Sequence, residues 1–236
     1  MKKVLNAAIA LWSVASLGLL ITATSANAAT IFFDDFNRTA SGTVGNGWSE
    51  SPGTDVSIVT GGSTIFVGGS PNNAMRLKGN SVSCSSGCTT PDVVASHINI
   101  DTLVSPPYTG LRLSFDWYGT EFEGSSDVNL SGGIGPDALL VSWNKNGGSW
   151  NNLAPAISLT NNQWYHVSYN LPAGAIGSDN FGIRFASFVT SSVEYVKIDN
   201  VHVTSIPEPE IYAMLAAGLG LMGFVARRRK QQTTAA

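Results

Sequence analysis

Charged side chains are scarce in this sequence, and positive charge is scarcest in its middle. Only 12% of the 236 residues are charged. Between Ala29 and Ser205 there are 7 Lys and Arg residues against 14 Asp and Glu residues, so this part carries a formal charge of −7. Proteins that bind nucleic acid neutralise phosphates with Lys and Arg. The acidic middle therefore argues against nucleic acid as a partner.

Helical periodicity is also missing between residues 31 and 204. Apolar and polar residues alternate instead, as in LRLSFDWYG from Leu111 to Gly119. The same alternation occurs in DALLVSW, WYHVSYNL and FGIRF, and turn residues separate these runs. A period of two is typical of strands with one buried face. About ten such strands predict an all-β domain over residues 29–204, an antiparallel two-sheet β-sandwich of the jelly-roll type.

The last predicted strand, EYVKIDNVHVT, breaks its own alternation. Val196 and Ile198 share a face, whereas Val201 has the opposite parity. A regular strand would send one of these apolar groups into water, so the pattern predicts a β-bulge at Asp199 and Asn200. Such a bulge would re-aim a carboxylate. A local defect at the end of the sheet is the alternative.

The apolar run near the N-terminus is short and follows a positive start, MKK. Residues 7–21 are apolar apart from two serines, and the small residues ANA follow at 26–28. This order predicts a signal helix for the export machinery at residues 1–28, cleaved before Ala29. An uncleaved membrane helix is the alternative.

Cysteine is nearly absent. Cys84 and Cys88, in the loop CSSGC, are the two in the sequence. Export makes a disulfide permissible, and we expect one that closes this small ring. Two thiols without a second pair or a nearby His are a poor metal site.

Catalytic patterns are weak. His97, His166 and His202 lie in strand patterns without a carboxylate at a meaningful spacing, and no Gly-x-Ser-x-Gly motif precedes a helix. Retaining glycosidases need two carboxyls about 5 Å apart, and Glu121 and Glu123 would face the same side of a strand. A solvated acidic loop is the simpler interpretation. We therefore expect no catalysis, with a hydrolase that uses Glu121 and Glu123 as the alternative.

No long hydrophobic run occurs near the C-terminus either. Residues 211–226 form an apolar run of 16 residues, which as a helix would reach about 24 Å. A bilayer core of about 30 Å normally asks for about 20 residues. Pro207 and Pro209 are expected to keep the preceding backbone extended and free of regular pairing. The run is therefore expected to be a short, temporary transmembrane helix, with a retained single-pass tail as the alternative.

A proline motif, a short apolar span and a basic block occur in that order over residues 205–230, before a polar tail at 231–236. This arrangement resembles the PEP-CTERM sorting signal of exopolysaccharide-producing Gram-negative bacteria. The resemblance implies that a membrane-embedded exosortase recognises Pro207, Glu208 and Pro209 and cleaves near them. It implies transient inner-membrane association, then a place at the cell surface, the outer envelope or the extracellular matrix. The basic stop on the cytoplasmic side would be Arg227, Arg228, Arg229 and Lys230.

Residues 29–204 resemble jelly-roll and concanavalin A-like carbohydrate-binding modules. The resemblance lies in FFDDFNRTASGTVGNGW, DALLVSWNKNGGSW and EYVKIDNVHV. In such modules the first and last strands often lie side by side and share a structural calcium, which implies Asp34 or Asp35 and Asp199 as candidate ligands. Carboxylate and carbonyl oxygens are the ligands that calcium prefers. Solvated acids or strand-end caps are the alternative.

Carbohydrate binding depends on flat aromatic faces with polar groups beside them. Tryptophans within strand patterns are expected in the core: Trp117, Trp143 and Trp164. Three other aromatic residues are candidates for glycan binding: Trp150 beside a turn, Tyr118 opposite Trp117 in parity, and Tyr108 in a loop. The sequence thus predicts an exported, non-catalytic protein with a structural or adhesive role, with a surface-displayed glycan-active hydrolase as the alternative.

Overall fold

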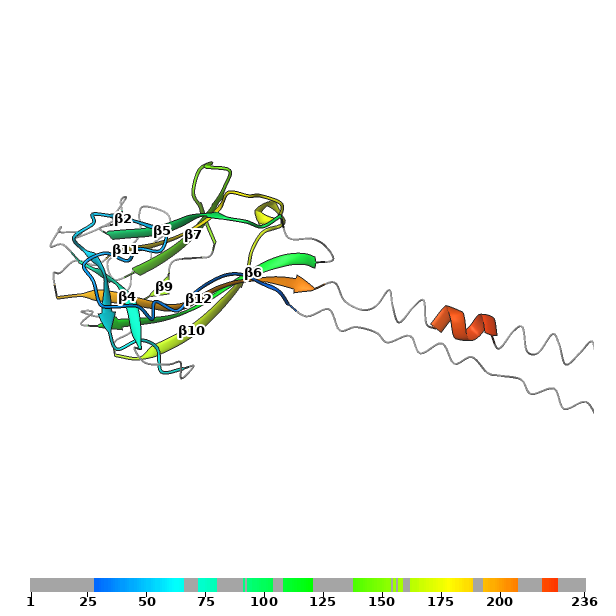
Figure 1. Cartoon of the computed structure of the whole chain (residues 1–236), viewed down its shortest axis with the longest axis horizontal. Coiled ribbons are helices and arrows are strands. Elements are labelled where there is room, and N and C mark those ends of the chain that lie inside the picture. The colour runs from blue at the N-terminus through cyan, green and yellow to red at the C-terminus, as the bar shows by residue number, and fades with distance from the viewer. Residues whose placement is uncertain are drawn as a thin grey trace, which may run out of the picture. The chain divides into compact units, whose positions relative to one another are not determined.

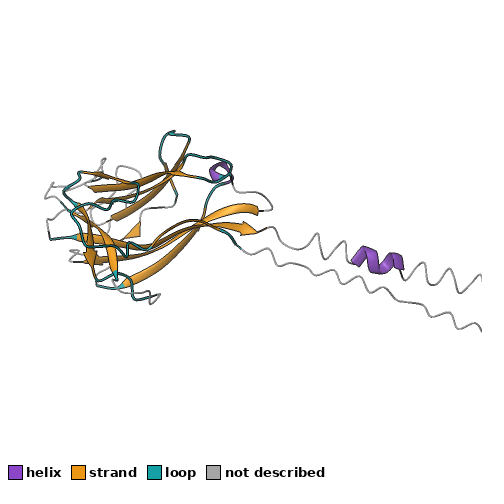
Figure 2. Ribbon diagram, in the orientation of Figure 1, coloured by secondary structure: helices purple, strands orange, loops and turns teal. Residues whose placement is uncertain are grey.

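The computed structural model describes residues 28–65, 72–79, 91, 93–103, 108–120, 138–153, 155, 157–158, 162–188, 193–207 and 218–224. Within this part of the chain, the strands belong to one compact unit, Ala26–Glu208. They form two antiparallel six-stranded sheets, which we call sheet A and sheet B (Figure 1 and Figure 2). The structure thus confirms the prediction of a two-sheet β-sandwich.

Sheet A has the strand order β10-β6-β12-β4-β3, with β1 also paired to β12. Its strands are β1 (Thr30–Asp34), β3 (Val56–Thr60), β4 (Asn73–Lys78), β6 (Tyr108–Thr120), β10 (Trp164–Asn170) and β12 (Tyr195–Pro207). Sheet B has the order β2-β5-β11-β7-β8, with β9 also paired to β7. Its strands are β2 (Trp48–Ser51), β5 (Val93–Ile100), β7 (Ala138–Lys145), β8 (Asn151–Asn152), β9 (Ile157–Ser158) and β11 (Phe181–Phe188). A short 3-10 helix, η1 (Ala173–Ala175), precedes β11.

The core lies between the two sheets and is built from the predicted alternation. In β6, the side chains of Leu111, Leu113 and Phe115 are fully buried. The Phe115 ring meets Phe185 of sheet B edge-on, with 4.9 Å between the ring centroids. Residues of the other parity in β6 point away from the core. We call that side the outer face of sheet A.

The predicted bulge in β12 is confirmed. The pairing of β12 with β6 shifts register between Asp199 and His202. Asn200 takes a positive φ of 49° at this point, a conformation that Asn tolerates better than most residues. The shift returns the next apolar residues to the core, so Ile198 and Val201 are both fully buried.

The first and last strands lie side by side, as the resemblance to carbohydrate-binding modules implied. β1 pairs antiparallel with β12, and Thr30 lies opposite Thr204. At the end of this pair, the Ala29 N–H donates to Ser205 Oγ at 2.8 Å, and the Ser205 N–H donates back to the Ala29 carbonyl at 2.9 Å. This pairing brings the end of β1 next to the bulge of β12.

The C-terminal prediction needs one correction. Pro207 is the last residue of β12 and lies opposite Tyr108 of β6, so it is not free of regular pairing. A β-edge position tolerates proline because the missing N–H costs no ladder bond there. Beyond the sandwich, residues 218–224 are helical. No helix among the described residues is both long enough and apolar enough to span a membrane.

Several predictions fall outside the described residues. These are the signal segment at 1–27, the Cys84–Cys88 disulfide, the Glu121 and Glu123 pair, Glu208 and Pro209 of the proline motif, the basic block Arg227–Lys230, and the tail at 231–236.

Candidate functional site

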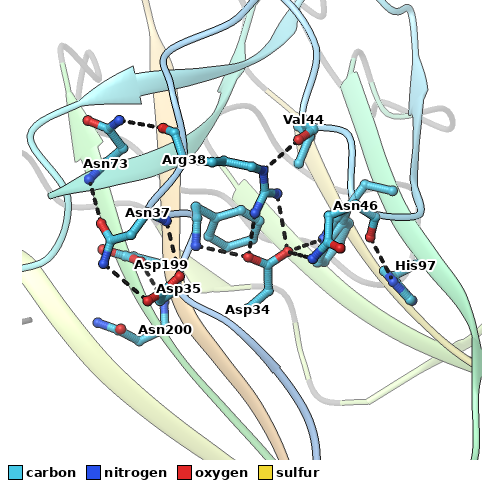
Figure 3. Close-up of polar contacts among 12 residues, drawn as sticks. Asp34, Asp35, Asn37, Arg38, Val44, Asn46, Asn73, His97, Asp199 and Asn200 are labelled. Atoms are coloured by element: carbon cyan, nitrogen blue, oxygen red, sulfur yellow. Dashed lines mark hydrogen bonds and ion pairs between the residues drawn. The ribbon is translucent and has the colours of Figure 1, made fainter. Parts of the chain in front are cut away.

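Polar side chains gather where β1 ends and β12 bulges (Figure 3). Asp34 is the last residue of β1, Asp35 follows it, and Asp199 lies at the bulge. In Figure 3, Asp35 lies beside Asp199. Asp34 points the other way, toward Arg38 and Asn46. The structure therefore separates the three predicted calcium ligands into two environments.

Asp34 is fully engaged by donors from its own loop. Arg38 forms a bidentate pair with it, at 2.7 and 3.2 Å. The Phe36 N–H donates at 2.9 Å, Trp48 Nε1 at 2.8 Å and Asn46 Nδ2 at 3.2 Å. Burial works against the charge, but the hydrogen bonds from Arg38, Phe36 and Trp48 outweigh it and hold the pKa of Asp34 below its ordinary value. Asp34 is a structural clamp for residues 34–48, and its oxygens are not available to a cation.

The carboxylate of Asp199 is held by fewer donors than that of Asp34, and its pKa is shifted in the opposite direction. Its side chain is buried, and its donors are the backbone N–H groups of Ser63, at 2.6 Å, and Asn200, at 2.7 Å. Burial raises the pKa of Asp199 to about 7; the two N–H donors oppose this shift, and the charges of Asp116 and Asp35 add to it. In the described part of the chain, no cation pairs with this carboxylate.

Three oxygen atoms from two segments, residues 72–73 and Asp199, converge beside Gly62. A Cβ atom placed on Gly62 would lie 2.3 Å from Asn72 Oδ1, 2.6 Å from the Asn73 carbonyl oxygen and 2.7 Å from Asp199 Oδ2. Only glycine fits this position, because real Cβ atoms do not approach other atoms so closely. We call these three oxygens the oxygen cradle.

Asn37 ties Asp35 to the oxygen cradle. Its backbone N–H and Nδ2 donate to the two oxygens of Asp35, at 3.1 and 3.2 Å. Its Oδ1 accepts the Asn73 N–H at 3.0 Å. The half-buried Asp35 carboxylate is therefore held near the segment whose carbonyl belongs to the cradle, where its charge acts on Asp199.

The oxygen cradle consists of ligand types that calcium accepts, rather than those typical of a transition-metal site. Among the described residues, no group of three or more His, Cys, Asp or Glu side chains could hold a metal ion. Calcium, however, accepts amide and backbone carbonyl oxygens together with carboxylates. The residues present therefore fit calcium, with Asp199 as the charged ligand, the two asparagine oxygens as neutral ligands, and Asp35 as a second charge nearby.

A second polar cluster lies on the outer face of sheet A. Asp116 is fully buried in the middle of β6, and its Oδ1 lies 2.7 Å from His166 Nδ1 of β10. Its Oδ2 accepts Asn200 Nδ2 at 2.9 Å, which the bulge in β12 brings into reach. Sequence spacing gave no carboxylate partner for the histidines, because this pair joins residues 50 positions apart through strand register. His166 therefore has a carboxylate partner that sequence spacing does not indicate.

Tyr118 lies beside this cluster and has an aromatic neighbour that the sequence analysis placed in the core. Tyr118 pairs across strands with Trp164, and their ring centroids are 5.5 Å apart at an interplanar angle of 46°. Both side chains are half-buried on the outer face of sheet A. Trp117 does lie in the core, stacked on Tyr165 at 4.8 Å. The core prediction for Trp164 is therefore wrong, since its parity is that of His166.

The other two aromatic candidates lie elsewhere. Trp150 precedes β8 of sheet B, and the guanidinium of Arg184 covers its ring at 4.8 Å from the centroid. Tyr108 begins β6 and donates its hydroxyl to the Thr102 carbonyl at 2.7 Å. The structure thus does not bring Trp150, Tyr108 and Tyr118 together into one binding surface.

Solved structures are similar to this chain at low sequence identity. An apo cyclase from Fischerella sp. aligns with a TM-score of 0.50 at 16% identity, over 78% of this chain and 100% of that chain. The CBM22-1 xylan-binding domain of Paenibacillus barcinonensis Xyn10C gives 0.48 at 12%, over 77% and 97%. The K3 cleaved adhesin domain of Lys-gingipain from Porphyromonas gingivalis gives 0.44 at 16%, over 75% and 99%. At these identities the likeness concerns the fold alone.

No curated protein matches the chain. The family model of the PEP-CTERM protein-sorting motif matches residues 205–230. The match begins inside β12, whose last residue is Pro207, and extends through the helical residues 218–224 to the basic block. The chain therefore carries a PEP-CTERM protein-sorting motif immediately after a β-sandwich domain.

Proposed function

We propose that this chain is an exported, non-catalytic surface protein that binds carbohydrate through the outer face of sheet A. The sorting motif supports export and placement at the cell surface. Processing by an exosortase, brief residence in the inner membrane of a Gram-negative cell and a final place in the extracellular matrix complete the proposal. Its role there is structural or adhesive.

The observation that carries the binding proposal is the pair Tyr118 and Trp164 beside the Asp116 cluster. Sugar rings stack on aromatic faces, and a few fixed polar groups set their orientation. Here two aromatic rings and the polar atoms of His166 and Asn200 lie on one face of one sheet. Their positions are set by strand register rather than by flexible loops, which keeps the surface pre-organised.

Binding fits this face better than hydrolysis does. A glycosidase needs two carboxyls that both reach the glycosidic bond. Asp116 and Asp199 are direct cross-strand partners, but they are only 0% and 2% exposed. Both oxygens of each carboxylate already accept hydrogen bonds or face His166. Because they are buried, the two acids would position neighbouring groups beneath the surface that a glycan would touch.

A matched set of tryptophan variants tests carbohydrate binding. Trp164→Ala is expected to weaken binding to the exopolysaccharide of the producing cells about tenfold, since a lost stacking contact is worth about 1 kcal/mol or more. Trp150→Ala is the control, because the Arg184 guanidinium already covers that ring. Affinity electrophoresis of the exported protein measures the shift. Equal binding by Trp164→Ala and the wild type would refute the proposal.

The hydrolase alternative is tested with the same polysaccharides. Glu121→Gln combined with Glu123→Gln removes the carboxyl pair that the sequence analysis named. Release of new reducing ends by the wild type, lost in the double variant, would establish the alternative in place of the proposal. No release by either protein is the expected result.

The sorting proposal is tested on the chain recovered from producing cells. Mass spectrometry of both termini is expected to show a start at Ala29 and the loss of Arg227 and all that follows. Pro207→Ala should block this processing while leaving the domain folded, because alanine can keep the pairing with Tyr108. Pro155→Ala, at an exposed position outside the motif, is the control. Exported wild-type protein that still ends at Ala236 would refute the sorting proposal.

We include one structural calcium in the proposal. Asp199, Asn72 and Asn73 would hold it through the oxygen cradle, and Asp35 would add negative charge. The ion would supply the positive charge that the buried Asp199 lacks and would fix the segment 61–63 against β4 and β12. Its role is structural, and its effect is measured on stability.

A further inference from the structure

The few positive charges of this acidic domain are concentrated in sheet A. Of the seven Lys and Arg residues between positions 29 and 205, four lie in strands β4, β6 and β12. These four are Arg76, Lys78, Arg112 and Lys197. Cations on one face of an otherwise acidic domain indicate a function for that face, because the net charge alone would repel polyanions.

Three of these cations lie on the same face of sheet A as the aromatic pair, and Lys197 is next to Tyr118. A single cross-strand row on the outer face runs from Arg76 through Lys197 and Tyr118 to Trp164. Lys78 lies two residues beyond Arg76, so it shares this face. We call Arg76, Lys78 and Lys197 the basic row.

Aromatic rings support the basic row from the side. The Lys197 Nζ lies 5.6 Å from the Tyr118 ring centroid and 5.9 Å from that of Tyr195. The Arg76 guanidinium lies 5.9 Å from the same Tyr195 ring. Cation–π contacts of this kind hold positive groups in place without neutralising their charge.

The charge of the basic row is uncompensated in the described part of the chain. Lys197 donates only to neutral carbonyl oxygens, those of Thr60 at 3.2 Å and Gly61 at 3.0 Å. None of the three cations forms an ion pair there, and Arg76 Nε is buried without a hydrogen-bond partner. Burial, with the adjacent Arg76 charge, lowers the pKa of Lys197. Like charges directly opposite each other destabilise a sheet. An anion bound here would therefore reduce the repulsion between Arg76 and Lys197.

Three acidic residues share this face with the basic row, and one of them, Asp55, lies across from Lys78 without forming an ion pair. Asp116 is engaged by His166 and Asn200. Asp199 is directed to the N–H of Ser63 at the oxygen cradle. The basic row is therefore open to an external anion beside a ring-stacking surface.

We propose that the glycan bound by the outer face of sheet A is anionic, with its acidic groups paired to the basic row and a sugar ring stacked on Tyr118 and Trp164. This inference rests on the proposed carbohydrate binding and adds the chemical class of the ligand. Arg76 suits it because a guanidinium binds a carboxylate or sulfate through two parallel hydrogen bonds. The shared chemistry is a sugar-borne anion, whether a uronic acid carboxylate or a sulfate ester.

Binding of the purified exported protein to paired polymers tests the inference. Polygalacturonate is compared with its methyl ester, and dextran sulfate with dextran, so each pair differs only in charge. We expect the charged member to bind at least about tenfold more tightly at low salt, with the preference falling as salt rises. The carboxylated and sulfated arms show which anion is preferred.

Variants assign the preference to the basic row. Arg76→Gln combined with Lys78→Gln is expected to remove the roughly tenfold preference for the charged polymer. Arg112→Gln is the matched control, since Arg112 lies on the same face but donates to Asn170 and is outside the row. Thermal unfolding of each variant confirms that it is folded. A fully preserved preference in the double variant, or an equal loss in Arg112→Gln, would overturn the inference.

The outcomes separate this inference from the function on which it rests. Binding to neutral polymers that depends on Trp164, without any preference for charge, overturns the anionic ligand and leaves carbohydrate binding intact. Binding to no polysaccharide overturns both. Equal retention of duplex DNA and polygalacturonate, unaffected by Trp164→Ala, would identify a general polyanion surface and would also overturn both.

Discussion

Asp116 of β6 and Asp199 of β12 are direct cross-strand partners, yet their carboxylates are held by different groups. Asp116 meets two side chains, His166 and Asn200, on the outer face. Asp199 accepts hydrogen bonds from two backbone N–H groups and contributes one oxygen to the oxygen cradle. The bulge after Asp199 causes this divergence, because it changes the direction of the residues on one side of the pair.

The first prediction concerns pH and Asp199. Its folded pKa of about 7 lies above the ordinary value of 3.8, so the folded state binds more protons than the unfolded state between these values. Its contribution to the free energy of unfolding is therefore fully present below the lower value and is lost as pH rises to about 7. We expect the difference in unfolding free energy between wild type and Asp199→Asn to shift in this window, by up to about 1.4 kcal/mol per pH unit.

Chemical denaturation in a chelator at several pH values measures this difference. Asp179→Asn, at an exposed position, is the control and should show no such window. Saturating calcium should abolish the fall in stability of the wild type, because the ion takes the place of the proton. A wild type that responds to calcium no more than Asp199→Asn does would contradict the calcium site.

The second prediction concerns Gly62. Gly62→Ala would force a Cβ atom into the oxygen cradle, where the Asn73 carbonyl belongs to the backbone and cannot move aside cheaply. We expect a loss of about 2 kcal/mol in the free energy of unfolding together with the loss of stabilisation by calcium. Gly42→Ala is the matched control, because its Cβ would meet nothing within 4 Å. Equal effects of the two substitutions in calorimetry would contradict the cradle.

The third prediction concerns Asp34. Asp34→Ala leaves the Arg38 guanidinium and Trp48 Nε1 without their shared acceptor. We expect a loss of about 3 kcal/mol, as is typical when one member of a buried ion pair is removed. The wild-type contribution should also fade as pH falls through the lowered pKa of Asp34, since it depends on the charged form. Tryptophan fluorescence during urea unfolding measures global stability, and an unchanged midpoint would refute the clamp.

The fourth prediction concerns Asp116. Asp116→Asn keeps the shape but turns one acceptor into a donor, which must then face either His166 or the Asn200 amide. We expect a loss of about 2 kcal/mol in stability, the usual size for hydrogen bonds to a charged group, and weaker glycan binding. Ser114→Ala, two residues away on the same face, is the control. Full stability and full binding in Asp116→Asn would show that the cluster supports neither.

The strands and the bulge were predictable, whereas the partners across strands were not. Burial on one face leaves a period of two along the chain, so LRLSFDWYG identified β6, and the parity change after Ile198 identified the bulge. The alternation also places Trp164 on the face of the strand opposite to that of Val167. The hydrophobicity of tryptophan nevertheless favoured the prediction that Trp164 lies in the core. The pairing of His166 with Asp116 depends on register, and the cradle at Gly62 depends on three separate segments. Neither leaves a trace in spacing along the sequence.

The bonds between Ala29 and Ser205 place the start of β1 and the end of β12 at the same corner of sheet A. Tension applied between these two points would act perpendicular to the strands. It would break the hydrogen bonds between β1 and β12 one after another. The same ladder pulled lengthwise would have to break many bonds at once. The β1–β12 pair is therefore expected to resist a pull along its strands better than a pull that separates the two ends of the sandwich.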